Sequence, residues 1–298
     1  MALSKLSEDQ HRSIFSQLCN VLEPRIVVYF SSVSLELWEL TQPLLQQLKT
    51  DYEAAAALCR KVGIRSCKEL REAKVVSCCD KGLSAADLTT LGTLGSVLPA
   101  LETLIFCEKS AGPDAVQQLV EGLGAGALPD VTYFQLMDMH VGDAGASALA
   151  AALGRGALPR LETLFLMNHT AIGDAGLVAL APALRRLPAL ESLYLYLNPL
   201  GDEGLAALVG PPPPAGTPPA GGLKKLKWLD LDDTRVTDAG CAALAAALNS
   251  GALPALRTLT LENIPASDAA KAAVYAARAN LRADESEDGE SEDGEEGS

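Results

Sequence analysis

The chain has 298 residues and a formal net charge of −14, and 48% of its residues are hydrophobic although only 4% are aromatic. Alanine and leucine supply most of the apolar content, which favours helix faces packed through small and medium side chains. Nine acidic residues and no basic residue lie between Asp284 and Ser298, yet the rest of the chain is also acidic. This balance disfavours nucleic-acid binding, because phosphate neutralisation needs a basic surface.

The first 69 residues are expected to form a helical cap over the exposed core of the following repeats. They lack the alternation of a strand, and Ser7–Gln10 has the pattern of a capping box. Apolar residues at helix-like spacing support this expectation: Ile14, Phe15, Leu18, Leu35, Trp38, Leu44, Leu45 and Leu48.

A repeated dipeptide marks the middle of the chain. Leu-Pro begins at Leu98, Leu128, Leu158, Leu187 and Leu253, and Leu223-Lys224 fills the remaining gap. The steps are 29 or 30 residues, apart from one of 36 that contains an insertion. A fixed period of this length predicts stacked structural repeats, here six in tandem.

Each unit combines a strand pattern with a helix pattern. It begins Leu-x-x-Leu-x-Leu, as at Leu101, Leu104 and Phe106, and the alternation at its end predicts a short strand with one buried face. Apolar residues at i, i+3, i+4 and i+7 then predict an amphipathic helix. One aspartate near the start of each helix is expected to cap that helix: Asp143, Asp174, Asp202 and Asp238.

Such units cannot bury their own apolar faces, so they must stack, with strands on one side and helices on the other. The pattern resembles the leucine-rich repeat family, in the ribonuclease-inhibitor-like subtype, whose repeats are about 28 to 29 residues long with one α-helix each. The resemblance implies an α/β solenoid with a curved parallel sheet inside and helices outside. A weaker unit with core positions at Val76 and Cys78 extends the expected repeats to 70–283.

Two further segments interrupt or follow the repeats. The proline-rich stretch at 209–222 is expected to be an insertion on the surface, with polyproline docking on a partner as an alternative. The acidic tail at 284–298 is expected to be disordered, because it has like charges and no apolar residue. It either keeps the protein soluble or contacts basic partners, with Ser286 and Ser291 as modification sites.

The cysteines and the start of the chain bear on the compartment. Seven cysteines, an odd number, lack CxxC or metal-ligand spacing, which predicts reduced thiols in an intracellular protein: Cys19, Cys59, Cys67, Cys78, Cys79, Cys107 and Cys241. Charged residues in the first nine positions predict no export signal. We expect a cytoplasmic protein, with the nucleus as a second compartment, and no membrane span.

Catalytic chemistry has few candidate residues. Only His11, His140 and His169 are available as histidines, and no Walker or Gly-x-Ser-x-Gly motif occurs. The glycine-rich stretch at 122–126 ends a predicted helix, the reverse of a phosphate-binding loop. We therefore expect no enzyme activity of its own, no metal and no cofactor.

Two other functions remain open. Ran GTPase-activating proteins, to which the chain is similar in architecture, also combine such repeats with an acidic C-terminal region, which implies GTPase activation. The segments Ile14–Leu18 and Leu58–Val62 are similar to parts of an F-box, which implies a substrate receptor of a ubiquitin ligase.

The alternation of side chains along each strand predicts a binding face on the concave side of the sheet. Five aromatic residues and three aspartates are expected there: Tyr133, Phe165, Tyr194, Tyr196, Trp228, Asp230, Asp232 and Asp233. A solvent-facing apolar patch of this kind marks an interaction site. We therefore predict a non-enzymatic scaffold whose protein partner presents an apolar anchor beside Lys or Arg. The alternative is that these rings only stiffen the sheet.

Overall fold

The computed structural model describes residues 20–109, 114–210 and 222–283, together with Ser7, Gln10 and residues 13–15. The expected acidic tail at 284–298 lies outside these residues, and so does most of the expected insertion at 209–222. Within that insertion, Val209 forms the end of a helix, which is therefore one residue longer than predicted.

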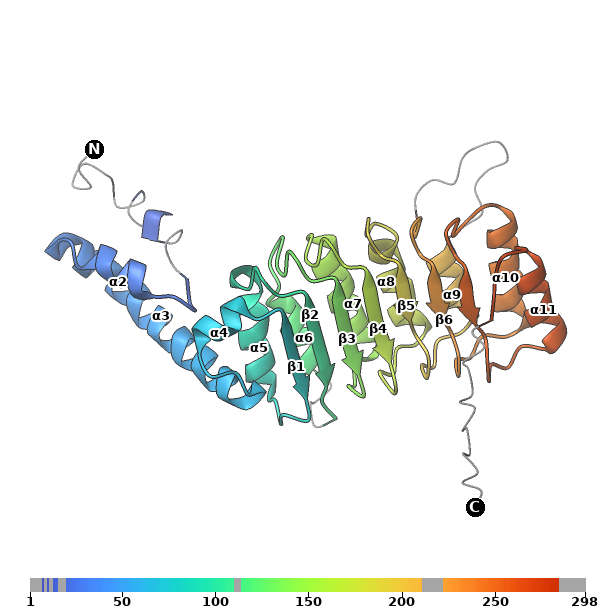
Figure 1. The fold of residues 1–298 in the computed structure, drawn as a ribbon, viewed down its shortest axis with the longest axis horizontal. Helices are drawn as coiled ribbons and strands as arrows, with labels where there is room; N and C mark the ends of the chain where they lie inside the picture. The colour runs from blue at the N-terminus through green and yellow to red at the C-terminus, as the bar shows by residue number, and fades with distance from the viewer. Residues whose placement is uncertain are drawn as a thin grey trace, which may run out of the picture.

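Seven parallel strands form one sheet in the order of the sequence (Figure 1). Neighbouring strands pair at equivalent repeat positions, as Leu104 does with Phe134 and Phe134 with Leu164. The predicted weak unit supplies the first strand and the six tandem units supply the others. The strands are β1 (Val75–Cys79), β2 (Thr103–Cys107), β3 (Tyr133–Met137), β4 (Thr163–Met167), β5 (Ser192–Tyr194), β6 (Trp228–Asp230) and β7 (Thr258–Thr260).

One helix follows each strand and lies behind the sheet in the view of Figure 1. The predicted core residues Leu101, Leu104 and Phe106 and their equivalents in later repeats are buried between the two layers. This arrangement confirms the expected α/β solenoid. The helices are α5 (Ala85–Leu94), α6 (Ala115–Glu121), α7 (Gly142–Gly154), α8 (Asp174–Leu184), α9 (Asp202–Val209), α10 (Asp238–Asn249) and α11 (Asp268–Ala276), with a 3₁₀ turn η2 (Gly95–Val97) after α5.

The N-terminal segment contains α2 (Arg25–Ser31), α3 (Leu35–Val62) and α4 (Cys67–Glu72). α3 is the longest of these, but neither it nor any other helix in the described part of the chain could cross a membrane. The last turns of α3 and α4 cover the first repeat, because Leu58, Cys59 and Leu70 join its core. These ends of α3 and α4 therefore pack directly on the first repeat.

The first half of α3 projects beyond the repeats together with α2 (Figure 1), so it does not cover them as predicted. Phe15, Val27 and Leu48 form a small separate core there. That core is too small to bury the remaining apolar residues, and eight large ones are exposed: Ile26, Val28, Tyr29, Val33, Leu35, Trp38, Leu44 and Tyr52. Of the residues behind the F-box similarity, Phe15 is buried in this small core, and Leu58 and Cys59 are buried in the core of the repeats.

The aspartate near the start of α7, α8, α9 and α10 contacts the helix of the next repeat, so the expectation that it caps its own helix is wrong. Asp143 Oδ1 accepts hydrogen bonds from the backbone N–H groups of Gly173 (2.7 Å) and Gly176 (3.0 Å) at the start of α8. Asp174, Asp202 and Asp238 make equivalent bonds to the starts of α9, α10 and α11. The carboxylates thus satisfy helix N–H groups that would otherwise lack a partner.

A glycine makes three of these four contacts possible. A Cβ atom on Gly176 would lie 2.6 Å from Asp143 Oδ1, and Cβ atoms on Gly204 and Gly240 would lie 2.8 and 2.3 Å from the equivalent oxygens. The Gly-Asp-x-Gly pattern therefore encodes a contact between repeats: the Asp reaches forward, and the second Gly makes room for the Asp of the preceding repeat.

Candidate functional site

Four of the five predicted aromatic residues form a continuous stack across β3 to β6. The ring centroids of Phe165 and Tyr194 lie 4.1 Å apart with an interplanar angle of 6°. Tyr133 lies 4.9 Å from Phe165 on one side, and Trp228 lies 5.9 Å from Tyr194 on the other. We call Tyr133, Phe165, Tyr194 and Trp228 the aromatic ridge. Tyr196 lies on the same face but hydrogen-bonds to Asn168 instead.

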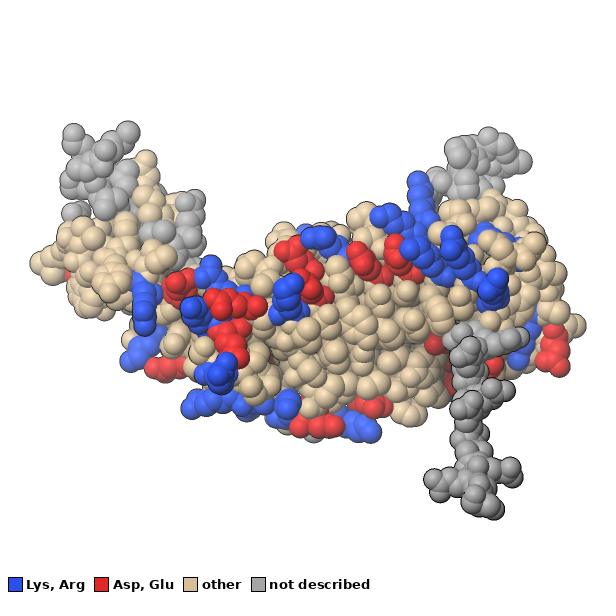
Figure 2. Space-filling model, in the orientation of Figure 1, with Lys and Arg blue, Asp and Glu red and all other residues tan. Residues whose placement is uncertain are grey.

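The ridge is less open to solvent than the sequence predicted. All four residues are half-buried, because each ring is covered in part by its neighbours. The surface around them carries few charges: in Figure 2 the middle of the sheet face is tan, and Lys, Arg, Asp and Glu gather along its two edges. The result is an apolar band bordered by charge.

One polar atom of the ridge has no partner. The indole Nε1 of Trp228 is shielded from solvent and finds no hydrogen-bond acceptor among the described residues. A buried donor without a partner costs about 1–3 kcal/mol of stability.

The three predicted aspartates meet where β6 ends, beside the ridge. Asp230 is paired in register with Tyr194, and its Oδ1 accepts hydrogen bonds from Asp232 N (3.1 Å) and Thr260 Oγ1 (2.7 Å). Asp232 Oδ1 accepts from the backbone N–H of Glu262 at 2.6 Å. Asp233 follows in the turn and is exposed. Asp230 and Asp232 thus lie close to each other at one end of the ridge.

The ionised form of the Asp232 carboxyl group is disfavoured in the folded protein. Burial raises its pKa, and the nearby charges of Asp230 and Glu262 raise it further, although the hydrogen bond from Glu262 acts in the opposite direction. A basic group from a partner would relieve this repulsion, because an opposite charge favours the ionised carboxylate.

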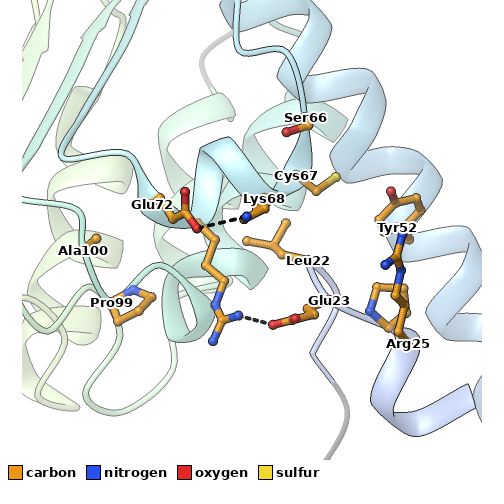
Figure 3. Close-up of a pocket in the computed structure, with 12 residues that line it drawn as sticks. Leu22, Glu23, Arg25, Tyr52, Ser66, Cys67, Lys68, Glu72, Pro99 and Ala100 are labelled. Carbon is orange, nitrogen blue, oxygen red and sulfur yellow. Dashed lines mark hydrogen bonds and ion pairs between the residues drawn. The ribbon is translucent and has the colours of Figure 1, made fainter. Parts of the chain in front are cut away.

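A cavity of about 660 Å³ near the N-terminus was not predicted. It lies between α2, α3, α4 and the loop before β2 (Figure 3), with Leu22, Tyr52, Cys67 and Pro99 among its lining residues. Several of its charged groups pair with one another: Arg71 with Glu23, and Lys68 with Glu72 at 3.9 Å. The lining comes from separate segments, so no local sequence pattern could have indicated it.

Residues suited to metal or acid–base chemistry do not gather in the described part of the chain. No group of three or more His, Cys, Asp or Glu there could hold a metal ion. His140 and His169 are exposed residues in turns. The sheet face therefore remains the strongest candidate site.

Comparison with known proteins agrees with the repeat architecture. The leucine-rich repeat family profile matches residues 160–181, 187–209 and 222–245. Over 137 residues the chain is 34% identical to the ribonuclease inhibitor of Sus scrofa, an alignment that covers 46% of this chain and 28% of the inhibitor. This is a leucine-rich repeat protein of the ribonuclease-inhibitor type. Such repeats are the architecture of a protein-interaction scaffold, although the chain spans little more than a quarter of the inhibitor it matches.

Two solved structures are similar to this leucine-rich repeat protein to a lesser degree. The yeast Rad7–Elc1 complex contains a chain with a TM-score of 0.46 and 18% identity, covering 68% of this chain and 44% of that one. An internalin of Listeria monocytogenes has a TM-score of 0.36 and 15% identity, covering 66% and 50%. Likeness of this degree says nothing about function.

Proposed function

We propose that this leucine-rich repeat protein is a non-catalytic scaffold that binds one partner protein on its sheet face, centred on the aromatic ridge. The stack of four rings over β3 to β6 is the observation that carries the proposal. Stacked, half-buried rings offer a rigid apolar surface that loses little conformational freedom when a partner binds. Aromatic residues of this kind dominate the binding energy of many protein interfaces.

The polar groups beside the ridge support a choice of partner. Asp230, Asp232 and Asp233 form an acidic rim at one end of the ridge. A partner with an apolar anchor over the rings and a Lys or Arg beside them would complement both the ridge and the acidic rim. The charge complementarity would favour this partner over one with an acidic flank.

The ridge is tested by replacing Tyr194 or Trp228 with Ala. Each change removes ring surface from the centre of the proposed interface, so we expect each to weaken partner binding by about 2 kcal/mol or more, which is roughly thirtyfold. The measurement is affinity capture from an extract of the source cells, followed by titration of the captured protein against each variant. Circular dichroism establishes that the variants remain folded.

Val178→Ala is the matched control, since Val178 is 37% exposed on α8, away from the sheet face. The proposed partner should bind this variant as it binds the wild type. Equal binding by the wild type and both ridge variants would show that the rings only stiffen the sheet and that the partner binds elsewhere.

A further inference from the structure

Four sulfur-containing residues form a row across the sheet face, at the ends of strands β1 to β4. The strand register pairs Cys79 with Cys107, Cys107 with Met137, and Met137 with Met167. Each of them follows a buried core residue in its strand, so its side chain lies on the sheet face. Neighbouring strands are about 4.8 Å apart, which places consecutive sulfur side chains side by side. We call these four residues the sulfur row.

Neighbouring sulfur-containing side chains of this row interact. Cys79 and Cys107 are paired in register on adjacent strands, and their thiols act on each other. Gln135 Nε2 lies 3.8 Å from both Cys107 Sγ and Met137 Sδ, and Tyr133 Oη donates a hydrogen bond of 2.8 Å to Gln135 Oε1. Gln135 is itself buried, with an exposed fraction of 8%. The Gln135 amide is thus held in place beside both sulfur atoms.

The two thiols of the row are also the accessible ones. Among the described cysteines, Cys79 and Cys107 are half-buried on the sheet face, whereas the other four are buried. The charges of Asp138 and Asp80 act on Cys107, and Asp138 also pairs with Lys109 at 3.7 Å. Two carboxylates near the thiols make the site attractive to a cation.

We propose that Cys79 and Cys107 together bind one Cu(I) ion, with the thioether of Met137 as a third ligand. Thiolate and thioether sulfur are soft ligands that suit Cu(I), as well as Zn²⁺ and iron–sulfur clusters. Zn²⁺ would require a tetrahedral set of four ligands, and the described residues hold no cluster of three or more His, Cys, Asp or Glu around these thiols. The low number of ligands and their softness both favour Cu(I).

Cu(I) binding deprotonates the two thiols but does not change the oxidation state of copper or of sulfur. Two thiols and one Cu(I) ion give a bis-thiolate complex and release two protons to solvent. The spacing of adjacent strands is also compatible with a disulfide between Cys79 and Cys107, but a disulfide would make no use of Met137.

The test titrates the full-length, reduced protein without oxygen, using Cu(I) supplied as its bicinchoninate complex. We expect the protein to remove one Cu(I) ion per chain from the bicinchoninate complex, and this uptake should require both Cys79 and Cys107. The protein should bind Zn²⁺ much more weakly than Cu(I). Cys79→Ser and Cys107→Ser should each abolish this uptake. Met137→Leu keeps the volume but removes the sulfur, and should weaken binding on the order of tenfold, the size of effect seen for supporting groups in metal sites.

Cys78→Ala and Met139→Leu are matched controls, because both residues are buried in the core and should leave Cu(I) uptake unchanged. Alkylation of the wild-type protein with iodoacetamide adds a readout that does not depend on variant folding: bound Cu(I) should protect Cys79 and Cys107. The proposal is overturned if the protein withdraws no Cu(I), if uptake persists in both Ser variants, or if the two thiols form a disulfide and take up no copper.

Discussion

The buried side chain of Asn198 ties two repeats together through both of its polar atoms. Its Oδ1 accepts hydrogen bonds from Thr170 Oγ1 (2.7 Å) and Ile172 N (3.0 Å). Its Nδ2 donates to the carbonyl oxygens of Leu166 (2.7 Å) and Leu195 (2.9 Å). A buried amide is tolerated only when it is satisfied in this way. Glu108 has a similar role in the turn after β1, because its side chain accepts hydrogen bonds from the backbone N–H groups of Lys81 and Leu83.

Asp232 leads to a prediction about pH and stability. Its pKa is raised in the folded protein, so the folded state binds this proton more tightly than the unfolded chain does. The ionised group therefore costs stability above the raised pKa, and this cost disappears below the ordinary pKa of Asp. Asp232→Asn removes the charge but keeps an acceptor for Glu262. We expect the variant to be more stable than the wild type at pH 7 and equally stable near pH 3, as measured by urea unfolding.

Asp233→Asn provides the control for this prediction. Asp233 is exposed and has a positive φ of 52°, a conformation that Asn tolerates as well as Asp. Its replacement should change the free energy of unfolding by less than about 0.5 kcal/mol. A loss of stability in Asp232→Asn at pH 7 would show that Asp232 is stabilised by its hydrogen bond more than it is destabilised by burial.

At the scale of the helices, the carboxylates that bridge repeats should contribute measurably to stability. Asp174 Oδ1 accepts hydrogen bonds from Gly201 N (2.7 Å) and Gly204 N (2.8 Å) at the start of α9. Asp174→Ala leaves both donors without this partner, and we expect a loss of about 1–2 kcal/mol in the free energy of unfolding, as for other lost helix caps. Urea denaturation followed by circular dichroism measures the change.

The companion variant Asp174→Asn separates hydrogen bonding from charge. A single oxygen accepts both bonds, so the amide oxygen of Asn can replace it, and we expect most of the stability to be retained. An equal loss in the Ala and Asn variants would mean that the negative charge at the helix N-terminus, rather than the hydrogen bonds, stabilises this junction.

At the scale of the whole molecule, one hydrophobic core runs continuously through the stacked repeats and ends at Leu281. Leu281 is buried, and the backbone of Arg282 pairs with both Arg257 and Leu259 beside β7. The residues from Asp284 onward contain no apolar side chain. Deleting Asp284–Ser298 should therefore leave the melting temperature nearly unchanged, because no apolar surface is removed from the core.

A deletion that begins three residues earlier is the matched comparison. Removing Leu281–Ser298 also eliminates the buried Leu281 and the Arg282 pairing, so it should lower the melting temperature by several degrees. A large decrease caused by the shorter deletion would show that the acidic tail packs on the repeats.

Much of the fold and part of the candidate site could be predicted from the sequence. The core leucines of each strand and the outward position of Phe165, Tyr194 and Trp228 follow from alternation, a local property that the structure reproduces. The half-burial of the rings could not be predicted, because it depends on how neighbouring side chains stack. The direction of each bridging aspartate was also mistaken, since its partner lies in the next repeat.

The sequence by itself determined the repeat period, the type of each element and the side chains that face the core, because helix and strand periodicities are written along the chain. Only the tertiary structure decided which residues of different repeats meet: the rings of the ridge, the sulfur row, and the aspartates that cap neighbouring helices. These contacts join residues about one repeat apart, and they depend on strand register and side-chain conformation. The exposure of the first half of α3 also could not be predicted from the sequence, because an amphipathic pattern predicts a helix but does not predict which surface packs against it.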